Sequence, residues 1–305
     1  MIKQEKSFKS GFVAVIGKPN VGKSTLINKL IGQKIAAVSP KPQTTRKTQL
    51  GILTTSDGQL IFVDTPGLHK PHHKLGELMN QNAMDVMDES DIILVIVDGS
   101  VPPKKDNDQF QLSSFIDRIN IPKTVLAINK IDKVKEETLE VHENAYLELY
   151  PNAIPLKVSA VRGDNLDILL PLLFSLLPEG EPFYPVDQIT DLYEREIAAD
   201  LIRAACMIHL RKEIPHAVAI RIDQYSERGE HAIYMEATIF VERDSQKGIV
   251  IGRGGKMLKK IGMNARSEIE VMNGKNTFLQ LRVKVRKNWR NDEKTLLRFG
   301  FSSTQ

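Results

Sequence analysis

The chain has 305 residues, of which 41% are hydrophobic and 26% charged, and it contains one cysteine, Cys206. This composition is typical of a soluble globular protein, and a single cysteine excludes an intrachain disulfide, so we expect a reducing, cytoplasmic environment. The formal net charge is +4, but residues 247–290 hold twelve Lys and Arg against two acids, a net +10 that leaves −6 for the rest.

No segment of the sequence suits export or a membrane span. The first ten residues are charged and polar and lack the apolar core of a signal peptide. The longest apolar runs, such as residues 92–97, are far shorter than the roughly 20 residues that a span needs. Association with a membrane surface stays open. The basic segment 247–290 indicates either a polyanion-binding site or a solvated basic face.

Short apolar runs alternate with amphipathic stretches over residues 12–176. Such β-branched runs are typical of strands buried on both faces of a parallel sheet, and the intervening segments are long enough for crossover helices. The predicted strands cover residues 12–17, 59–64, 92–98, 124–129 and 154–160. This alternation predicts an α/β doubly wound domain, in which ligands bind at the carboxyl ends of the strands.

The first predicted strand leads into GKPNVGKS, residues 17–24, which fits the pattern G-x-x-x-x-G-K-S. Between a strand and a helix, this pattern indicates a phosphate-binding P-loop. Gly17 and Gly22 let successive backbone N–H groups face phosphate oxygens. Lys23 supplies charge to the β- and γ-phosphates, and Ser24 offers a hydroxyl to Mg²⁺. The predicted phosphate-binding residues are Gly17, Lys18, Pro19, Asn20, Val21, Gly22, Lys23, Ser24 and Thr25.

A second strand ends in the sequence DTPG, where Asp64 can hold Mg²⁺ through water and the N–H of Gly67 can reach a γ-phosphate. The next residue is Leu68, where Ras-like switches carry a water-positioning glutamine. Leucine cannot orient water, so hydrolysis would rest on electrostatics and backbone groups. The predicted nucleotide-binding residues at this strand end are Asp64, Thr65, Pro66, Gly67 and Leu68.

Two polar segments, residues 39–49 and 68–82, are predicted to be switch loops. In the first, Thr44 or Thr45 can reach Mg²⁺ when a γ-phosphate is present, and we favour Thr45. An ordinary polar loop is the alternative for this segment.

The sequence NKID, residues 129–132, ends another strand and predicts specificity for guanine. Guanine presents two adjacent donors, N1–H and the 2-amino group, which the carboxylate of Asp132 can accept together, whereas adenine lacks the amino donor. Asn129 is predicted to tie the base to the P-loop, and the stem of Lys130 to pack along the ring. Ser159 and Ala160 end the last predicted strand, and the N–H of Ala160 can reach guanine O6.

The proline-rich residues 177–191 indicate an extended linker between domains at 8–180 and 181–305. Asp191 and Glu194 form a possible capping box for the next helix, whose apolar pattern places Cys206 in the core. The predicted elements beyond the linker are a helix at 191–212, strands at 217–227 and 232–242, a glycine-rich turn with a basic helix over 248–272, and a strand at 278–287.

GRGG, residues 252–255, fits the G-x-x-G loop with which a KH domain clamps about four single-stranded nucleotides. Its glycines let the backbone approach the phosphates, and the neighbouring basic residues add charge. Trp289 could stack on a base or pack within the domain. The predicted RNA-binding residues are Gly252, Arg253, Gly254, Gly255, Lys256, Lys259 and Lys260.

These motifs together resemble those of the Era-like GTPases of the translation-factor-related P-loop class. The resemblance covers nearly the whole chain and rests on GKPNVGKS, QTTRK, DTPGLH, NKID and VSA in one half and VIGRGGKMLKKIG in the other. It implies an α/β P-loop GTPase domain, with a mostly parallel sheet and helices on both faces, followed by an α+β type II KH domain.

The resemblance also implies a GTP-hydrolysing switch that binds the 3′ end of 16S ribosomal RNA and assists assembly of the small ribosomal subunit. It implies GTP or GDP and Mg²⁺ as ligands, and a cytoplasmic protein partly attached to the inner face of the cell membrane. We expect a monomer. In related GTPases with an asparagine at the position of Asn20, a K⁺ ion neutralises developing charge. Asn20 is therefore a candidate K⁺ ligand, and bracing of the loop is its alternative role.

The predicted catalytic residues are Asn20, Lys23, Thr45 and Gly67, and the predicted Mg²⁺ ligands are Ser24, Thr45 and Asp64. Other functions remain open. An RNA-modifying enzyme would need a third site with a nucleophile or cofactor motif, and the sequence shows none. A GTPase that remodels membranes, or a switch that acts mainly at the membrane surface or on another RNA, would use the same basic segment.

Overall fold

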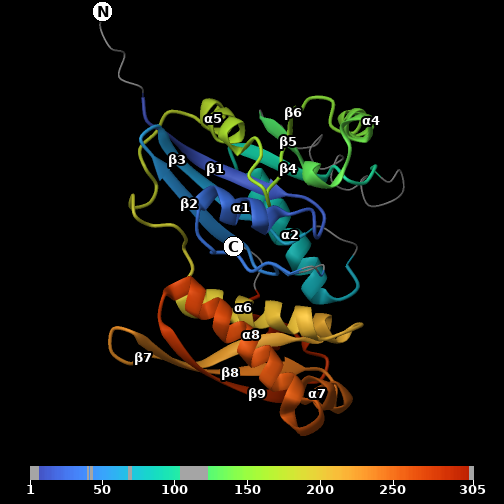
Figure 1. Ribbon diagram of the computed structural model, residues 1–305, viewed down its shortest axis with the longest axis vertical. Helices are drawn as coiled ribbons and strands as arrows, with labels where there is room; N and C mark the ends of the chain where they lie inside the picture. The colour runs from blue at the N-terminus through green and yellow to red at the C-terminus, as the bar shows by residue number, and fades with distance from the viewer. Residues whose placement is uncertain (1–6, 40, 42–43, 68–70, 104–122, 302–305) are drawn as a thin grey trace, which may run out of the picture. The chain divides into compact units, whose positions relative to one another are not determined.

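The computed structural model describes every residue except 1–6, 40, 42–43, 68–70, 104–122 and 302–305 (Figure 1). The chain forms two compact units. The described residues of the first unit fall within Met1–Gln33, Lys47–Lys70 and Met79–Asp191. Those of the second fall within Lys34–Arg46, Pro71–Leu78 and Leu192–Gln305. Two short early segments, 34–46 and 71–78, therefore group with the C-terminal part of the chain.

The first unit is built on a six-stranded sheet with the order β2-β3-β1-β4-β5-β6. Neighbouring strands are parallel except for β2 and β3. In β1 and β4, consecutive residues are fully buried whichever face they point to, so both faces of the central sheet are covered. The strands are β1 Lys9–Ile16, β2 Gln49–Thr55, β3 Gly58–Asp64, β4 Ile92–Asp98, β5 Thr124–Asn129 and β6 Ile154–Lys157.

Helices cover this sheet through regularly spaced apolar residues. Met87 of α2, together with Leu139 and Tyr146 of α4, packs against one set of side chains from β1, β4 and β5. The helices labelled in this part of Figure 1 are α1 Lys23–Ile31, α2 Lys74–Asp88, α4 Glu136–Leu147 and α5 Leu166–Leu176. Residues of α2 from Met79 onward belong to the first unit.

Three elements differ from the sequence-based prediction. β2 was not among the predicted strands, because it is a partly exposed antiparallel edge strand without a continuous apolar run. The strand at 154–160 is shorter and less buried than predicted: β6 ends at Lys157, and Ile154 is 40% exposed at the other edge. The predicted loop 68–82 is wrong in its second half, because Leu75, Met79 and Ala83 form a buried helical stripe.

The second unit packs helices against one face of a three-stranded sheet, order β7-β8-β9. β7 runs antiparallel to β8, and β9 runs parallel to it. The elements are α6 Glu194–His209, β7 Ala219–Glu227, β8 Ala232–Val241, α7 Asp244–Ile251, α8 Lys256–Asn273, β9 Asn276–Val285 and α9 Glu293–Arg298, with 3₁₀ turns at Ile214–Ala217, Arg253–Gly255 and Trp289–Asn291.

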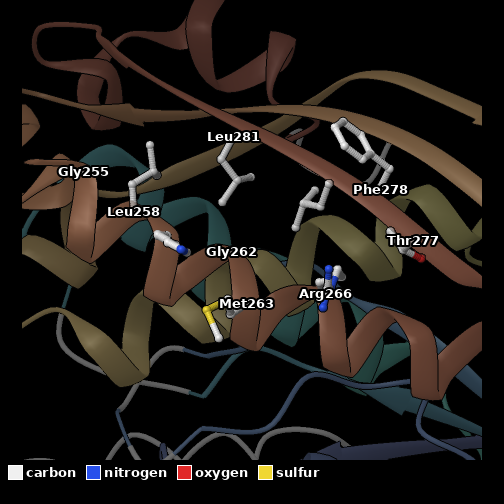
Figure 2. Close-up of a pocket in the computed structure, with 10 residues that line it drawn as sticks. Gly255, Leu258, Gly262, Met263, Arg266, Thr277, Phe278 and Leu281 are labelled. Carbon is white, nitrogen blue, oxygen red and sulfur yellow. The ribbon is translucent and has the colours of Figure 1, made fainter.

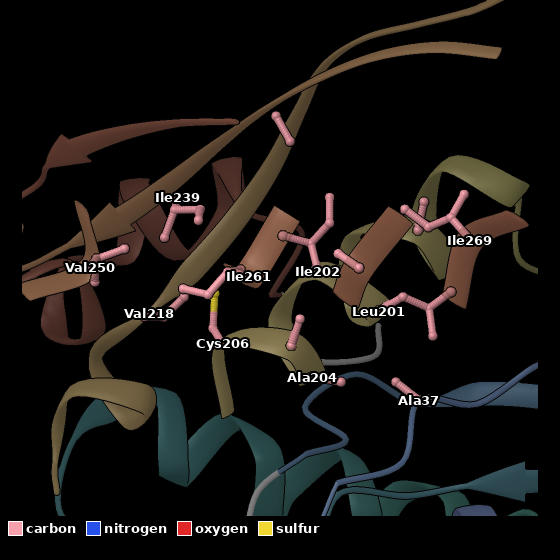
Figure 3. Packing of buried hydrophobic residues seen from close by; sticks show 14 of the residues in the cluster. Ala37, Leu201, Ile202, Ala204, Cys206, Val218, Ile239, Val250, Ile261 and Ile269 are labelled. Carbon is pink, nitrogen blue, oxygen red and sulfur yellow. The ribbon is translucent and has the colours of Figure 1, made fainter. Parts of the chain in front are cut away.

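The core of this unit lies between α6, α8 and the sheet (Figure 3). Cys206 is fully buried beside Val218 and Ile261, and burial raises the pKa of its thiol to about 12, which confirms that it is a core residue and not a reactive thiol. The predicted capping box at Asp191 is wrong. The helix begins at Glu194, and it is the carboxylate of Glu196 that accepts the N–H of Tyr193 at 3.2 Å.

The segment 34–46 contributes a buried cation to the second unit. Arg46 is 3% exposed and donates hydrogen bonds to the backbone oxygens of Val218 at 2.7 Å and His216 at 2.8 Å. Its guanidinium lies 5.9 Å from the centre of the Trp289 ring, and the Trp289 indole N–H donates to the oxygen of Ala217 at 2.9 Å. Because Trp289 is fully buried, it packs within the domain and cannot stack on a base.

Candidate nucleotide site and nucleic-acid groove

The P-loop backbone requires glycine at two positions. Gly17 has φ +156° and Gly22 has φ +107°, conformations that residues with a Cβ atom rarely adopt. A Cβ atom at Gly17 would lie 2.3 Å from the oxygen of Ile96, and one at Gly22 would lie 2.3 Å from the amide nitrogen of Asn129. The loop between β1 and α1 therefore encloses a space that side chains cannot enter.

Lys23 points its charge into this loop. The side chain is buried and donates to the backbone oxygens of Gly17 at 2.9 Å and Lys18 at 3.1 Å. Burial lowers the pKa of Lys23 to about 8, and the nearby carboxylate of Asp64 partly offsets that effect. An ammonium group held by carbonyl oxygens in a dry site is stabilised further by an anion, so the loop fits a phosphate group.

Ser24 and Asp64 come together at the carboxyl ends of β1 and β3. The Ser24 hydroxyl donates to Asp64 Oδ2 at 2.8 Å, and Asp64 is only 1% exposed. The amide of Gln49, from β2, lies 3.4 Å from the same oxygen. A hydroxyl beside a carboxylate is a pair of hard oxygen donors that fits Mg²⁺.

The two threonines considered for Mg²⁺ differ in their local bonding. The Thr44 hydroxyl lies 2.6 Å from that of Ser39 and donates to the oxygen of Lys41 at 2.8 Å, so it is engaged in a local turn. Thr45 follows it and precedes Arg46 in the segment that belongs to the second unit. Which of the two threonines binds Mg²⁺ stays a prediction, and Thr45 is the one favoured from the sequence.

The DTPG segment is held close to the P-loop. A Cβ atom at Gly67 would lie 2.8 Å from the backbone nitrogen of Pro19, so only glycine permits this approach. The Thr65 hydroxyl is buried and donates to the oxygen of Val15 at 2.9 Å, which fixes the end of β3 beside β1. Leu68 lies outside the described residues.

The predicted base site assembles around Asn129. Its amide nitrogen donates to the oxygen of Val21 at 2.7 Å, and its amide oxygen accepts the N–H of Ala160 at 2.9 Å. A purine oxygen would therefore share the Ala160 N–H with Asn129. The Ser159 hydroxyl donates to one carboxylate oxygen of Asp132 at 2.6 Å and so orients that carboxylate.

One residue of this site was missed from the sequence. The ammonium group of Lys130 lies 2.5 Å from Asp98 Oδ2 and donates to the oxygen of Asn20 at 2.7 Å, so Asp98 fixes the end of the Lys130 side chain. Burial raises the pKa of Asp98, but hydrogen bonds from Lys130 and Ser100 outweigh it and hold the pKa below its usual value. The signal in the sequence was its position at the carboxyl end of β4.

The second unit carries a groove beside its glycine-rich turn. Gly252 has φ +72°, and a Cβ atom there would lie 2.6 Å from that of Met257. Gly254 and Gly255 have φ values of +59° and +76° with open space around them. The groove between α8 and β9 has a volume of about 400 Å³ (Figure 2). Its lining residues are Gly255, Leu258, Lys259, Gly262, Met263, Arg266, Thr277, Phe278, Leu279 and Leu281.

This groove combines an apolar floor with an exposed basic rim. Leucines from both elements line it, and four cations are exposed beside it: Arg253 in the preceding 3₁₀ turn, and Lys256, Lys259 and Lys260 at the start of α8. Apolar surface of this kind can contact bases while the cations contact phosphates, so the arrangement fits a single-stranded nucleic acid. None of the described helices combines the length and apolar character that crossing a membrane demands.

Comparison with known proteins covers both units. The family model described as 50S ribosome-binding GTPase matches residues 12–130, and the KH domain model matches residues 213–290. GTPase Era of Heliobacterium modesticaldum is 46% identical over 298 residues, covering 97% of this chain and 98% of that protein. GTPase Era of Halothermothrix orenii is 44% identical over 295 residues, covering 97% and 99%.

Solved structures agree with these relatives. Era in complex with MgGDPNP and nucleotides 1506–1542 of 16S ribosomal RNA aligns with a TM-score of 0.90 at 36% identity, covering 97% of this chain and 99% of that chain. A variant of Aquifex aeolicus Era bound to GDP·AlF4⁻ aligns with a TM-score of 0.91 at 36% identity, covering 97% and 100%. The predicted fold class, a P-loop GTPase domain followed by a KH domain, is confirmed. With such identity over nearly its whole length, the chain belongs to the Era family of GTPases.

Proposed function

We propose that the chain is a GTP-binding and GTP-hydrolysing switch that binds the 3′ end of 16S ribosomal RNA and assists assembly of the small ribosomal subunit. The observation that carries the proposal is the framework in which Asn129 joins the P-loop to Ala160 while Ser159 orients Asp132. An oriented carboxylate suits the two adjacent donors of guanine. The Era complexes with MgGDPNP and 16S ribosomal RNA and with GDP·AlF4⁻ support the same ligands for this chain.

Different residues of the site would bind the phosphates of GTP and the Mg²⁺ ion. The N–H groups of residues 17–24 and Lys23 would hold the phosphates, and Ser24, Asp64 and Thr45 would hold Mg²⁺. When bound, Mg²⁺ supplies positive charge to the phosphate oxygens. Gly67 would donate its N–H to the γ-phosphate. We also propose a monomer in the cytoplasm that is partly attached to the inner face of the membrane.

The adjacency of two residues in the chain, Thr45 and Arg46, supports coupling between GTP binding and RNA binding. We propose that residues 8–180 act as the GTP-binding domain and 181–305 as the RNA-binding domain. Thr45, the proposed Mg²⁺ ligand, is followed directly by Arg46, which is buried in the second unit. A change at Thr45 when the γ-phosphate is lost therefore acts on a residue that the RNA-binding part already holds.

The test compares RNA affinity in two nucleotide states. With an RNA of nucleotides 1506–1542 of 16S ribosomal RNA as the probe, we expect binding to be at least about fivefold tighter with GDPNP than with GDP. Thr45→Val, which lacks the metal-binding hydroxyl, should bind the RNA equally in both states. If the wild-type protein binds the RNA equally well with GDPNP and with GDP, the proposed coupling is wrong, because a ligand that binds two states equally shifts no equilibrium between them.

The presence of Leu68 and Asn20 leads us to expect that GTP hydrolysis depends on a monovalent cation. Leucine cannot position water, so charge stabilisation must carry more of the catalysis. Asn20 adopts φ +65° in the P-loop, and its backbone oxygen is held by Lys130. We propose that its side chain is a ligand of a K⁺ ion that neutralises developing charge.

Hydrolysis is therefore expected to be faster in K⁺ than in Na⁺ by about tenfold or more, which corresponds to 1.4 kcal/mol. Steady-state GTPase rates in the two salts at equal ionic strength measure this difference. Asn20→Gly keeps the left-handed backbone conformation and removes only the side chain, so its rate should be low and independent of the cation. The same K⁺ stimulation in Asn20→Gly as in the wild type would rule out the ligand role.

A further inference from the structure

A row of stacked side chains crosses the face of the second unit's sheet that the helices leave open. Tyr234 of β8 and Phe278 of β9 are register partners, and their rings stack with centroids 5.5 Å apart and planes 7° apart. The guanidinium of Arg228 lies 4.4 Å from the centre of the Tyr234 ring. The row therefore runs from Arg228 through Tyr234 and ends at Phe278.

The alternation of the strands explains why these rings lie outside the core. Ile233 and Met235 are buried with α6 and α8, so Tyr234 between them points to the opposite face. The Tyr234 hydroxyl donates to Glu236 Oε1 at 2.5 Å and lies 3.3 Å from Gln280 Oε1. These contacts orient the tyrosine ring and, through it, the ring of Phe278.

The exposed end of the row adjoins the groove. β9 is an edge strand, and Phe278 is 64% exposed although it also lines the groove. Figure 2 shows Leu281 pointing towards α8 and the Phe278 ring on the other side of the strand. Gly255 lies at one end of the groove, and Phe278 and Arg266 lie at the other. A nucleic-acid strand that leaves the groove at that end would meet the face of the Phe278 ring that Tyr234 does not cover.

We propose that Phe278 is a stacking subsite for one unpaired RNA base just outside the groove. The inference rests on the proposed RNA-binding function, and it adds one base-binding position outside the groove. Base–aromatic stacking needs an exposed ring held in a fixed orientation, and Tyr234 and Arg228 provide that support from behind. An RNA strand is favoured as the occupant because the row is continuous with the groove and the sheet face around it carries more cations than acids. The charged side chains of this face are Arg221, Asp223, Arg228, Glu236, Arg282 and Lys284.

The test is an abasic scan of the RNA of nucleotides 1506–1542. Each RNA carries one nucleotide without a base and therefore keeps its phosphate. For the wild-type protein, we expect one position beyond those in the groove where loss of the base weakens binding about 5- to 150-fold. Phe278→Ala should lose about as much affinity for the intact RNA, and the abasic change at that position should then cost it no more than about twofold. Phe278→Tyr should behave like the wild type.

The salt dependence of RNA affinity and a matched control variant distinguish base stacking by Phe278 from other roles of this residue. Phe278→Ala should keep the wild-type slope of log affinity against log salt, whereas Lys259→Ala should reduce it by about 0.7 if Lys259 contacts one phosphate. Val271→Ala truncates an apolar side chain on α8 that is 72% exposed and does not line the groove, and it should leave RNA affinity unchanged.

Three outcomes would contradict the stacking subsite in different ways. Wild-type affinity in Phe278→Ala would overturn the subsite while leaving the RNA-binding function intact. A uniform loss over all abasic RNAs, with a lower melting temperature, would assign Phe278 a structural role. If the wild-type protein fails to bind the RNA at all, the proposed function itself is wrong.

Discussion

Asp132→Asn is expected to weaken GTP binding by about 10⁴-fold and to create binding of XTP. The carboxylate of Asp132 would accept both N1–H and the 2-amino group of guanine, and an amide would place a donor against one of them. Xanthine has an oxygen at position 2, which accepts that new donor. The amide oxygen of asparagine can still accept the Ser159 hydroxyl, which donates to Asp132 at 2.6 Å, so the fold of the loop should survive.

Titration of both nucleotides against wild-type and variant protein measures the exchange. Hydrolysis of XTP by Asp132→Asn should approach the wild-type rate with GTP, because the phosphate site is unchanged. Ser159→Ala provides a matched control. It removes the hydroxyl that orients the carboxylate and should weaken GTP binding by only about tenfold, without any gain for XTP. Unchanged GTP affinity in Asp132→Asn would mean that the base is read elsewhere.

Gly254→Asp is expected to reduce RNA affinity at least tenfold, whereas Gly254→Asn should reduce it much less. Gly254 has φ +59°, a left-handed conformation that Asp and Asn tolerate better than other residues with side chains, and a Cβ atom there meets nothing within 4 Å. The two variants therefore have the same shape and similar strain. They differ in one negative charge, which would repel a phosphate held at the start of α8 by up to several kcal/mol.

Binding of the RNA of nucleotides 1506–1542 at two salt concentrations measures this effect. The difference between the variants should shrink at high salt, because the repulsion is screened. GTP binding should stay unchanged in both, since Gly254 lies in the second unit. If Asp and Asn reduce RNA binding equally, the charge at this turn is irrelevant and RNA does not approach it.

The phosphate-binding and metal-binding motifs were predictable because the residues of each motif are adjacent in the sequence. A P-loop needs glycine where φ is positive, and Gly17 and Gly22 occupy such positions. The apolar runs of β1, β3, β4 and β5 were equally evident, because strands buried on both faces of a sheet consist mainly of apolar residues. β2 escaped prediction because an edge strand needs no continuous apolar run.

The sequence by itself determined the type of the nucleotide site and the G-x-x-G turn, because both depend on local backbone geometry. Only the tertiary structure decided which distant residues complete them. Asp98 meets Lys130, and Arg46 packs beneath Trp289, because separate elements bring them together. The stack of Tyr234 on Phe278 depends on the register between β8 and β9, which joins residues 44 positions apart and has no local signature.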